Sequence, residues 1–223
     1  MAAESTDASL ARAATGAENG ALLSGVHSVP DFHRIKAEGA SFVFLDATTG
    51  TTPSPNFQRE TTGAIAAEMI HGAYAVGRPK QSSGAAQAGY LLSHGGSWTA
   101  DGLTLPPALE MEHNPDGSAC YDLSHAAMVR WISDFANTIH QATTRYPIII
   151  TTANWWNKCT GDSQSFGSTS PLLAVHWGVH VGALPAGWSS YTFWEHADSG
   201  RLPGQQIVFN GNLALLLSFA RGG

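Results

Sequence analysis

Residues 146–151, with the sequence Tyr-Pro-Ile-Ile-Ile-Thr, form a short apolar run, and Phe42-Val43-Phe44-Leu45 is a second run of the same kind. Runs of β-branched and aromatic residues without polar alternation are typical of strands buried on both faces of a sheet. Comparable runs alternate with amphipathic stretches from residue 25 to the end of the chain. This alternation is the pattern of βα units around a parallel sheet, and it predicts a closed α/β barrel.

The expected elements of this barrel can be placed along the sequence. The helix at 123–143 has the clearest signal, because Trp131, Phe135 and Ile139 repeat at helical spacing after Ser124, a residue type that favours a helix N-cap. Its aromatic stripe is expected to lie in the core. Strands are predicted at 25–29, 42–46, 71–76, 107–112, 146–151, 172–177 and 191–196, and the other helices at 31–38, 57–69, 84–94 and 211–221.

The first residues differ in composition from the rest of the chain. Residues 1–24 are rich in Ala, Ser, Gly and Thr, which predicts a flexible leader ahead of a single barrel-like domain at 25–223. The leader lacks the basic start and the apolar stretch of a signal peptide. Either a signal was removed or the natural protein stays inside the cell, and the sequence leaves both possibilities open.

The composition excludes several classes of protein. Hydrophobic residues make up 43% of the 223 residues and charged residues 13%, which indicates a compact globular protein. A net charge of −6 with 11 Lys and Arg in all argues against binding to nucleic acid. No apolar run reaches the length of a membrane span. We therefore expect a protein without a membrane segment or a nucleic-acid partner, and we expect a monomer.

Cys120 and Cys159 are the 2 cysteines of the chain. Their spacing fits neither a Cys-x-x-Cys redox motif nor a zinc site with four ligands. A single disulfide is the favoured interpretation, and it favours an oxidising compartment.

Glu110 and Glu112 lie two residues apart at the end of the predicted strand 107–112. Because side chains alternate along a strand, both point the same way, with Cα atoms roughly 6–7 Å apart. Repulsion and burial would raise the pKa of one carboxyl and leave a proton donor beside an anion, as glycoside cleavage requires. The alternative is a solvated strand end that carries two glutamates.

Several motifs, in order over residues 25–221, resemble the fungal and actinobacterial branch of the family-25 glycoside hydrolases, the Chalaropsis-type muramidases. They are Ser82–Ala88, His94–Gly102, Ala119–Ser124, Trp155–Gly161 and Phe209–Gly211. The resemblance implies an irregular barrel of the TIM type, a disulfide between the two cysteines, a secreted protein and a glycan substrate. It implies no cofactor.

The resemblance also assigns the catalytic positions. Glu112 matches the proton donor of the family, and Glu110 stands where the family has an aspartate. The first-strand pattern Gly-x-Asp-x-Ser of the family corresponds in this resemblance to Gly25–Val29, which puts His27 at the aspartate position. Asp46 stands where the second strand of the family carries a lysine.

Further changes fall on positions expected to bind substrate. Several of the residues that replace those of the family are themselves ionisable. The pocket is therefore expected to carry a new set of charges, whereas loss of function alone would leave small or random residues. The expected substrate-binding residues are Tyr74, His176, Trp194, Glu195 and Gln205, the last at a position where the family often has an aspartate.

Three functional hypotheses follow. The leading one is a muramidase-like hydrolase of β-1,4-linked N-acetylated amino sugars, with Glu112 as acid and Glu110 as anionic stabiliser. The second is a non-hydrolytic acid–base enzyme of a biosynthetic pathway that uses His27, Asp46, His176 and Glu195 on a small-molecule substrate. The third is a catalytically silent glycan-binding protein. A metal site is disfavoured, because the chain has no His-x-His or His-Glu-x-x-His motif.

Overall fold

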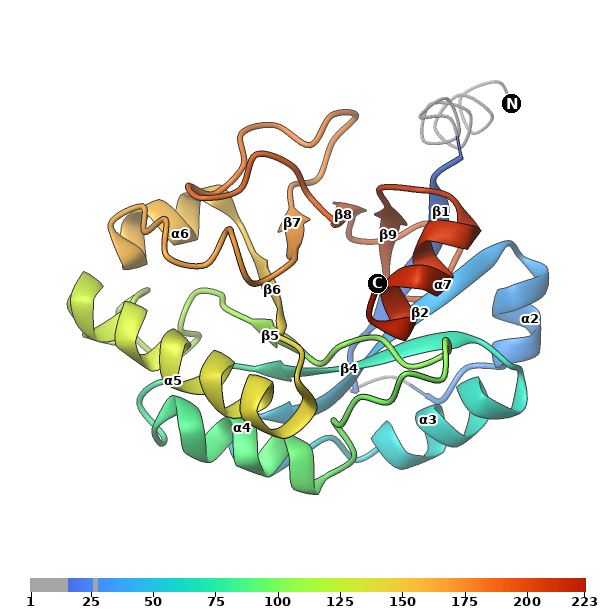
Figure 1. Ribbon diagram of the computed structural model, residues 1–223, viewed down its shortest axis with the longest axis horizontal. Coiled ribbons are helices and arrows are strands. Elements are labelled where there is room, and N and C mark those ends of the chain that lie inside the picture. The colour runs from blue at the N-terminus through green and yellow to red at the C-terminus, as the bar shows by residue number, and fades with distance from the viewer. Residues whose placement is uncertain (1–15, 26–27) are drawn as a thin grey trace.

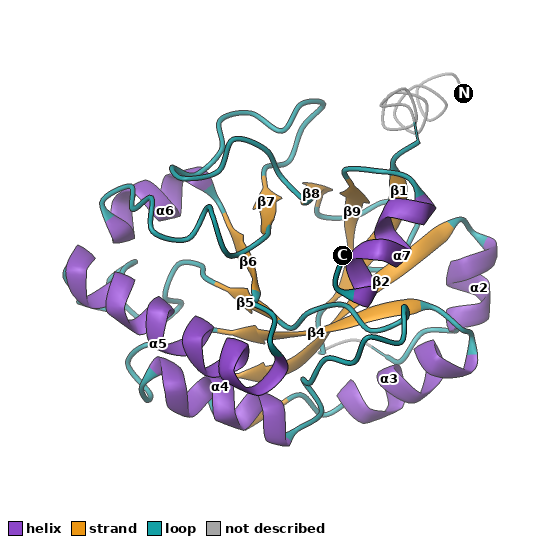
Figure 2. Ribbon diagram, viewed as in Figure 1, coloured by secondary structure: helices purple, strands orange, loops and turns teal. Residues whose placement is uncertain are grey.

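The computed structural model describes residues 16–25 and 28–223, and strands close into a barrel at its centre (Figures 1 and 2). One sheet contains 9 strands in the order β1-β9-β8-β7-β6-β5-β4-β2-β3, and a further pairing of β1 with β2 closes the ring. The short β3 (Thr52–Pro53) pairs with β2 alone and lies outside the ring. The ring strands are β1 (Glu18–Leu23), β2 (Ala40–Thr49), β4 (Ile70–Val76), β5 (Ala108–Glu110), β6 (Ile148–Thr151), β7 (Leu172–Val175), β8 (Phe193–Ala197) and β9 (Gln205–Phe209).

The barrel is mixed rather than fully parallel. Strand β9 runs antiparallel to both of its neighbours, β8 and β1, whereas the other neighbouring ring strands are parallel. The carboxyl ends of the parallel strands therefore meet at one end of the barrel. This architecture confirms the predicted irregular α/β barrel.

Helices surround part of this ring (Figure 1). They are α2 (Phe32–Ala37), α3 (Phe57–Ala66), α4 (Gly84–Ser93), α5 (His125–Thr143), α6 (Ala153–Thr160) and α7 (Leu213–Arg221). The predicted N-cap of α5 is confirmed, because the Ser124 side chain accepts a hydrogen bond from the backbone N–H of Ala127 at 3.3 Å. Trp131, Phe135 and Ile139 of α5 are buried, as their spacing predicted.

The hydrophobic core has two layers, separated by the sheet. Phe42 and Phe44 of β2 belong to the cluster inside the barrel, whereas Val43 and Leu45 belong to the cluster between sheet and helices. Leu216 and Ala220 of α7 join the inner cluster, and Phe219 packs against Phe193 and Phe209 with ring centroids 5.8 and 6.2 Å apart. Because Phe193 begins β8 and Phe209 ends the antiparallel β9, α7 closes the end of the barrel opposite to the carboxyl ends.

The first strand lies earlier than predicted. It spans Glu18–Leu23 rather than 25–29, so the expected leader boundary at residue 24 is wrong for residues 18–23. This segment pairs with β2 and β9, and a Cβ at Gly20 would lie 2.5 Å from the Phe42 ring, so glycine allows the close approach of the two strands. Residues 1–15 of the expected leader lie outside the described residues.

Other differences are smaller. Strand β9 and helix α6 were not predicted, because Gln205-Gln206 breaks the apolar run of β9 and α6 is only 8 residues long. Strand β5 ends at Glu110, so Glu112 lies beyond the strand rather than on it.

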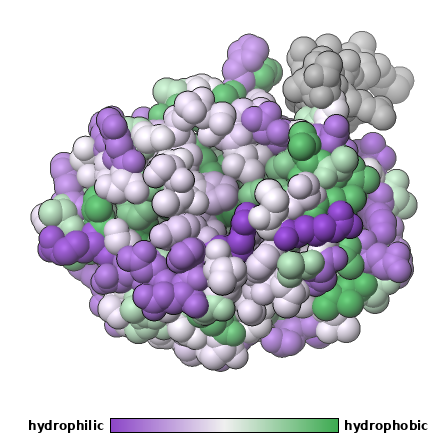
Figure 3. All heavy atoms as spheres, viewed as in Figure 1, coloured by the Kyte–Doolittle hydropathy of each residue, from purple (hydrophilic) through white to green (hydrophobic). Residues whose placement is uncertain are grey.

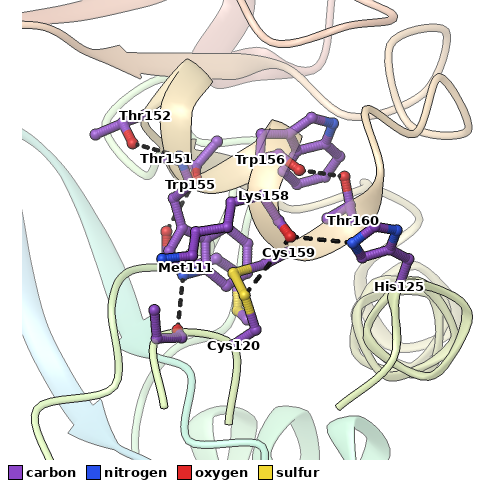
Figure 4. The surroundings of a disulfide bond; sticks show 11 residues. Met111, Cys120, His125, Thr151, Thr152, Trp155, Trp156, Lys158, Cys159 and Thr160 are labelled. Carbon is purple, nitrogen blue, oxygen red and sulfur yellow. Dashed lines mark hydrogen bonds between the residues drawn. A yellow bond between two sulfur atoms is a disulfide. The ribbon is translucent and has the colours of Figure 1, made fainter. Parts of the chain in front are cut away.

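The Cys120–Cys159 disulfide is present, with an S–S distance of 2.00 Å (Figure 4). It joins the segment after β5 to helix α6, which follows β6. On the outer surface, Figure 3 shows a hydrophobic area over α7, where Leu213 and Leu215 are exposed. Among the described residues, no helix is both long and apolar enough to cross a membrane.

Candidate active site

Acidic side chains converge at the carboxyl ends of the barrel strands. Asp46 of β2, Glu110 of β5 and Glu195 of β8 each lie two residues after a member of the inner core cluster. Side-chain alternation therefore turns all three toward the barrel interior. In α/β barrels the active site lies at this end, because the variable loops leave from it.

Glu110 is held deep in the barrel mouth, with part of its surface still accessible. Burial raises its pKa to about 8, and the negative charges of Glu112, Glu195 and Asp46 act in the same direction, while Arg78 opposes them. At neutral pH this carboxyl group is therefore mostly protonated. No hydrogen bond joins it to another residue among those that the structure describes.

Glu112 has different surroundings. Its side chain is 47% exposed, and its Oε1 atom lies 3.2 Å from both Nη1 and Nη2 of Arg78. Arg78 is itself 16% exposed, and its Nη1 also donates to the Tyr121 hydroxyl at 3.0 Å. A guanidinium placed in this way stabilises a carboxylate through charge-assisted hydrogen bonds.

Arg78 was not singled out in the sequence, although it follows a predicted strand by two residues. Its backbone is fixed by the buried Gln87, whose Oε1 accepts from the Arg78 N–H at 3.0 Å and whose Nε2 donates to the Arg78 carbonyl at 2.7 Å. The neighbouring Gly77 N–H donates to the Glu110 carbonyl at 2.9 Å. These contacts set the guanidinium beside the end of β5.

A second acidic pair lies between β2 and α3. Asp46 Oδ2 accepts a hydrogen bond from the Gly25 N–H at 3.3 Å, and burial raises the pKa of this carboxyl. Glu60 of α3 is 1% exposed, and burial followed by the charge of Asp46 raises its pKa to about 7. Asp46 Oδ1, Ser54 Oγ and Glu60 Oε2 have no hydrogen-bond partner within the described part of the chain. Glu60 was missed, although its spacing from the apolar Phe57 and Ala64 indicates the buried face of a helix.

Glu195 orients an exposed tryptophan. Its Oε1 accepts a hydrogen bond from Trp177 Nε1 at 2.8 Å, while the Trp177 residue is 58% exposed. Burial raises the pKa of Glu195 to about 7, the Trp177 hydrogen bond opposes this, and Asp198 adds to it. The sequence places Trp177 at the end of a predicted strand. It does not single out Trp177 from the other tryptophans as a site residue, because its hydrogen-bond partner Glu195 is 18 residues away.

The predicted substrate-binding residues divide into two groups. Tyr74 is 2% exposed and stands beside Asp46 in the strand register, and Gln205 lies opposite Leu22 at the carboxyl end of β1. Both belong to the ring of residues around the mouth. Burial and four nearby carboxylates, Glu110 first, raise the pKa of Tyr74 well above its ordinary value.

His176 and Trp194 make their hydrogen bonds to the loop between β7 and β8. Trp194 Nε1 donates to the His176 carbonyl at 2.7 Å, and His176 Nδ1 lies 3.0 Å from the His180 carbonyl. By strand alternation Trp194 points away from the interior face that carries Glu195. These contacts hold both side chains against the loop, and their role in substrate binding stays a prediction.

The first-strand position at which the family has an aspartate is occupied by Leu22 rather than by His27. His27 lies outside the described residues, and β1 ends at Leu23, before it. Gly20-Ala21-Leu22-Leu23-Ser24 fits the Gly-x-Asp-x-Ser spacing on the strand itself and puts Leu22 at the aspartate position. Leu22 is 2% exposed and belongs to the inner core cluster, so this position contributes no charge to the mouth.

Among the residues that the structure describes, no group of three or more His, Cys, Asp or Glu could hold a metal ion. Around one opening lie buried carboxyl groups with raised pKa values, Glu110 and Glu195 among them, and an exposed carboxyl group, Glu112, that pairs with Arg78. Such a set can donate a proton and stabilise a cation at the same time.

The chain is similar to known proteins over most of its length. Residues 23–205 match the family described as Glycosyl hydrolases family 25. An N,O-diacetylmuramidase of Arthroderma benhamiae is 40% identical over 93% of this chain and 88% of that protein. The structure of a muramidase from Acremonium alcalophilum has 46% identity and a TM-score of 0.89, over 92% of this chain and 100% of that one. A family GH25 lysozyme from Aspergillus fumigatus has 40% identity and a TM-score of 0.90 over 92% and 100%. These matches confirm the resemblance of the motifs, and the chain belongs to family 25 of the glycosyl hydrolases.

Proposed function

We propose that this protein is a muramidase-type hydrolase that cleaves β-1,4-linked N-acetylated amino sugars such as those of peptidoglycan. The observation that carries the proposal is the pair formed by Glu110 and Glu112 at the barrel mouth. One is buried with its pKa raised to about 8, and the other is exposed and paired with Arg78. The names of the relatives, muramidase and lysozyme, support the same substrate class.

The pair can supply both halves of glycoside cleavage. A protonated carboxyl group gives its proton to the leaving oxygen, and an anionic carboxylate stabilises the positive charge that develops on the sugar. Because Leu22 replaces the first-strand carboxylate, the acetamido oxygen of the substrate is the favoured nucleophile, and the product retains its anomeric configuration.

The test is the release of reducing ends from purified peptidoglycan between about pH 4 and 8. We expect the wild type to cleave, and the double variant Glu110→Gln/Glu112→Gln to lose about a hundredfold or more of the rate. Asp116→Asn is a matched control, since Asp116 lies in the same exposed segment after β5. Circular dichroism establishes that each variant is folded.

Two outcomes contradict the proposal. A folded wild type that releases no reducing ends is not a muramidase, and saturable binding to N-acetylchitotetraose without turnover would then identify a glycan-binding protein. Undiminished cleavage by the double variant would move the chemistry away from these two residues.

We also propose that the protein works outside the cell as a monomer. The Cys120–Cys159 bond supports the location, because disulfides persist in oxidising compartments. Sedimentation of the purified protein tests the monomer.

A further inference from the structure

A groove of about 400 Å³ lies between helix α2 and the loop that joins β8 to β9. One wall is formed by Pro30 and α2, which stands outside the ring of strands (Figure 1), and the other by residues 200–203. None of the carboxyl groups of the mouth is among the lining residues that the structure describes. A hollow of this size can hold a small ligand or a few residues of a peptide. We call it the α2 groove.

The α2 groove borders the mouth of the barrel. Gly204 directly follows the lining residues, and a Cβ at this position would lie 2.2 Å from the carbonyl oxygen of Leu22. Leu22 stands opposite Gln205 at the carboxyl end of β1, where the mouth lies. One loop therefore forms both a wall of the groove and part of the rim of the mouth. A chain attached to a sugar in the mouth can reach the groove over this rim.

The loop wall is held in place by the protein itself. The buried Gln206 accepts a hydrogen bond from the Leu202 N–H at 3.1 Å. Its Nε2 atom donates to the carbonyl groups of Leu202 at 2.9 Å and of Gly204 at 2.8 Å. Leu202 of this wall and Ile35 of the facing wall belong to the same core cluster. Walls fixed in this way lose little conformational entropy when a ligand binds between them.

The charged residues of the α2 groove leave one cation unpaired. Asp31 Oδ1 caps helix α2, since it accepts from the backbone N–H groups of His33 at 3.0 Å and Arg34 at 3.2 Å. The Arg34 Nε atom pairs with Glu38 Oε1 at 2.8 Å. Arg201 is exposed and makes neither an ion pair nor a hydrogen bond with any residue that the structure describes. The groove therefore presents one free guanidinium to an anion.

The base of the groove is apolar, because the buried side chains of Ile35 and Leu202 line it. A guanidinium binds a carboxylate through two parallel hydrogen bonds, and an apolar base favours methyl groups over hydroxyl groups. A peptide of small residues that carries a carboxylate meets both requirements. A neutral sugar chain would leave Arg201 without an anionic partner.

We propose that the α2 groove binds the peptide that peptidoglycan carries on its N-acetylmuramic acid, with Arg201 holding a carboxylate of this peptide. The inference rests on the proposed function, because that function brings a peptide-bearing glycan to the mouth. An extended peptide of four residues spans about 13 Å, so it can pass from a sugar in the mouth over the rim at Gly204. The protein should therefore favour peptide-bearing strands over bare glycan.

The first experiment measures binding without turnover. The probe is the tetrapeptide L-alanyl-γ-D-glutamyl-L-lysyl-D-alanine, and binding is followed by the backbone amide NMR signals of the protein. We expect the peptide to shift the signals of residues 200–204, and Arg201→Gln to weaken its binding about three- to fivefold. The same peptide with both carboxyl groups converted to carboxamides should show a similar loss on the wild type. Absence of these shifts at about 10 mM peptide would overturn the inference.

Two further variants test the charge assignment. Arg130→Gln is the matched control, because Arg130 is exposed on α5 and lines no part of the α2 groove, and it should bind the peptide as the wild type does. Glu38→Gln releases Arg34 from its ion pair and gives the groove a second free guanidinium, so binding should strengthen about two- to threefold. Weaker binding by Glu38→Gln, or equal losses in Arg201→Gln and Arg130→Gln, would contradict the inference.

Turnover measures the resulting specificity. The two substrates are linear glycan strands that carry their peptides and the same strands after an amidase has removed the peptides. We expect kcat/KM of the wild type to be about three- to fivefold higher on the peptide-bearing strands, and Arg201→Gln to lose this preference while Arg130→Gln keeps it. An equal preference in the wild type and Arg201→Gln would overturn the inference. Cleavage of neither substrate, with binding of the tetrapeptide intact, would count against the proposed function alone.

Discussion

The disulfide region and the acidic cluster formed by Asp46, Ser54 and Glu60 differ in how completely their buried polar atoms are hydrogen-bonded. Around the disulfide, Trp155 Nε1 donates to the Ala119 carbonyl at 3.3 Å and Trp156 Nε1 donates to the Ser163 carbonyl at 2.9 Å. Thr160 Oγ1 donates to the Trp156 carbonyl at 2.6 Å (Figure 4). In the acidic cluster, Asp46, Ser54 and Glu60 each keep a buried oxygen without a partner in the described structure. Buried polar groups are normally paired, so exceptions that gather at a barrel mouth indicate a site maintained for function at a cost in stability.

Removal of the disulfide should have the largest effect on stability. The bond closes a loop with a sequence separation of 39, so the chain-entropy model gives a loss of about 4 kcal/mol in the free energy of unfolding for Cys120→Ser/Cys159→Ser. Urea denaturation at constant pH measures it. The change should be the same at pH 5 and pH 8, because this region holds no carboxyl group with a raised pKa among its described residues.

Reduction of the wild type is the control for this double variant. It breaks the same bond without changing the side chains, so both should lower the urea midpoint by the same amount. A loss below about 1 kcal/mol would mean that the packed tryptophans alone hold α6 in place.

Substitution of Glu60 should act in the opposite direction and depend on pH. The folded protein raises the pKa of Glu60 from 4.5 to about 7, so it binds this proton more tightly than the unfolded chain does. The folded protein therefore loses stability as the pH rises from about 4.5 to 7, and the full cost is present above that range. Glu60→Gln removes the charge and should stabilise the protein by about 1–3 kcal/mol at pH 8, with no gain at pH 4.

Glu68→Gln serves as the matched control, because Glu68 follows the same helix and is exposed. It should leave the urea midpoint unchanged at both pH values. If Glu60→Gln destabilised the protein equally at pH 4 and pH 8, packing rather than charge would govern this position, and the contrast with the disulfide region would fail.

The sequence predicted the parts of this molecule that depend on local pattern. The apolar run before Glu110 placed this residue at the end of a barrel strand, and helical spacing placed Trp131 in the core. The first strand was missed because the run from Gly20 to Leu23 is short and follows a leader of similar small residues, which also displaced the aspartate match to His27.

The remaining features depend on contacts between distant segments. Arg78 and Glu112 are 34 residues apart and meet only when β4 and β5 lie side by side. The raised pKa of Glu110 follows from burial and nearby carboxylates, and the pairing of Glu112 follows from that contact; neither has a local signal. For the same reason the hydrogen bond from Trp177 to Glu195 could not be predicted.

The smallest expected effect concerns Trp177, the exposed aromatic residue that Glu195 orients. Its indole face is open to solvent at the mouth, a position suited to stacking on the apolar face of a sugar ring. Trp177→Ala should weaken binding of N-acetylchitotetraose by about 3- to 10-fold, equivalent to about 1 kcal/mol, when measured by calorimetry at pH 6.

Trp177→Phe separates stacking from orientation, because it keeps an aromatic ring but removes the donor to Glu195. The lost hydrogen bond had favoured ionised Glu195, so the pKa of that carboxyl should rise further above about 7. Because the aromatic ring remains, the affinity of this variant for the sugar should fall less than that of Trp177→Ala. Because the pKa of Glu195 is higher, any change of affinity with the ionisation of Glu195 should occur at a higher pH than in the wild type. Trp194→Phe is the control, since its indole binds the His176 carbonyl away from the mouth. If that control weakened binding as much as Trp177→Phe, the order of the β7–β8 loop, and not the ring over Glu195, would determine affinity for the sugar.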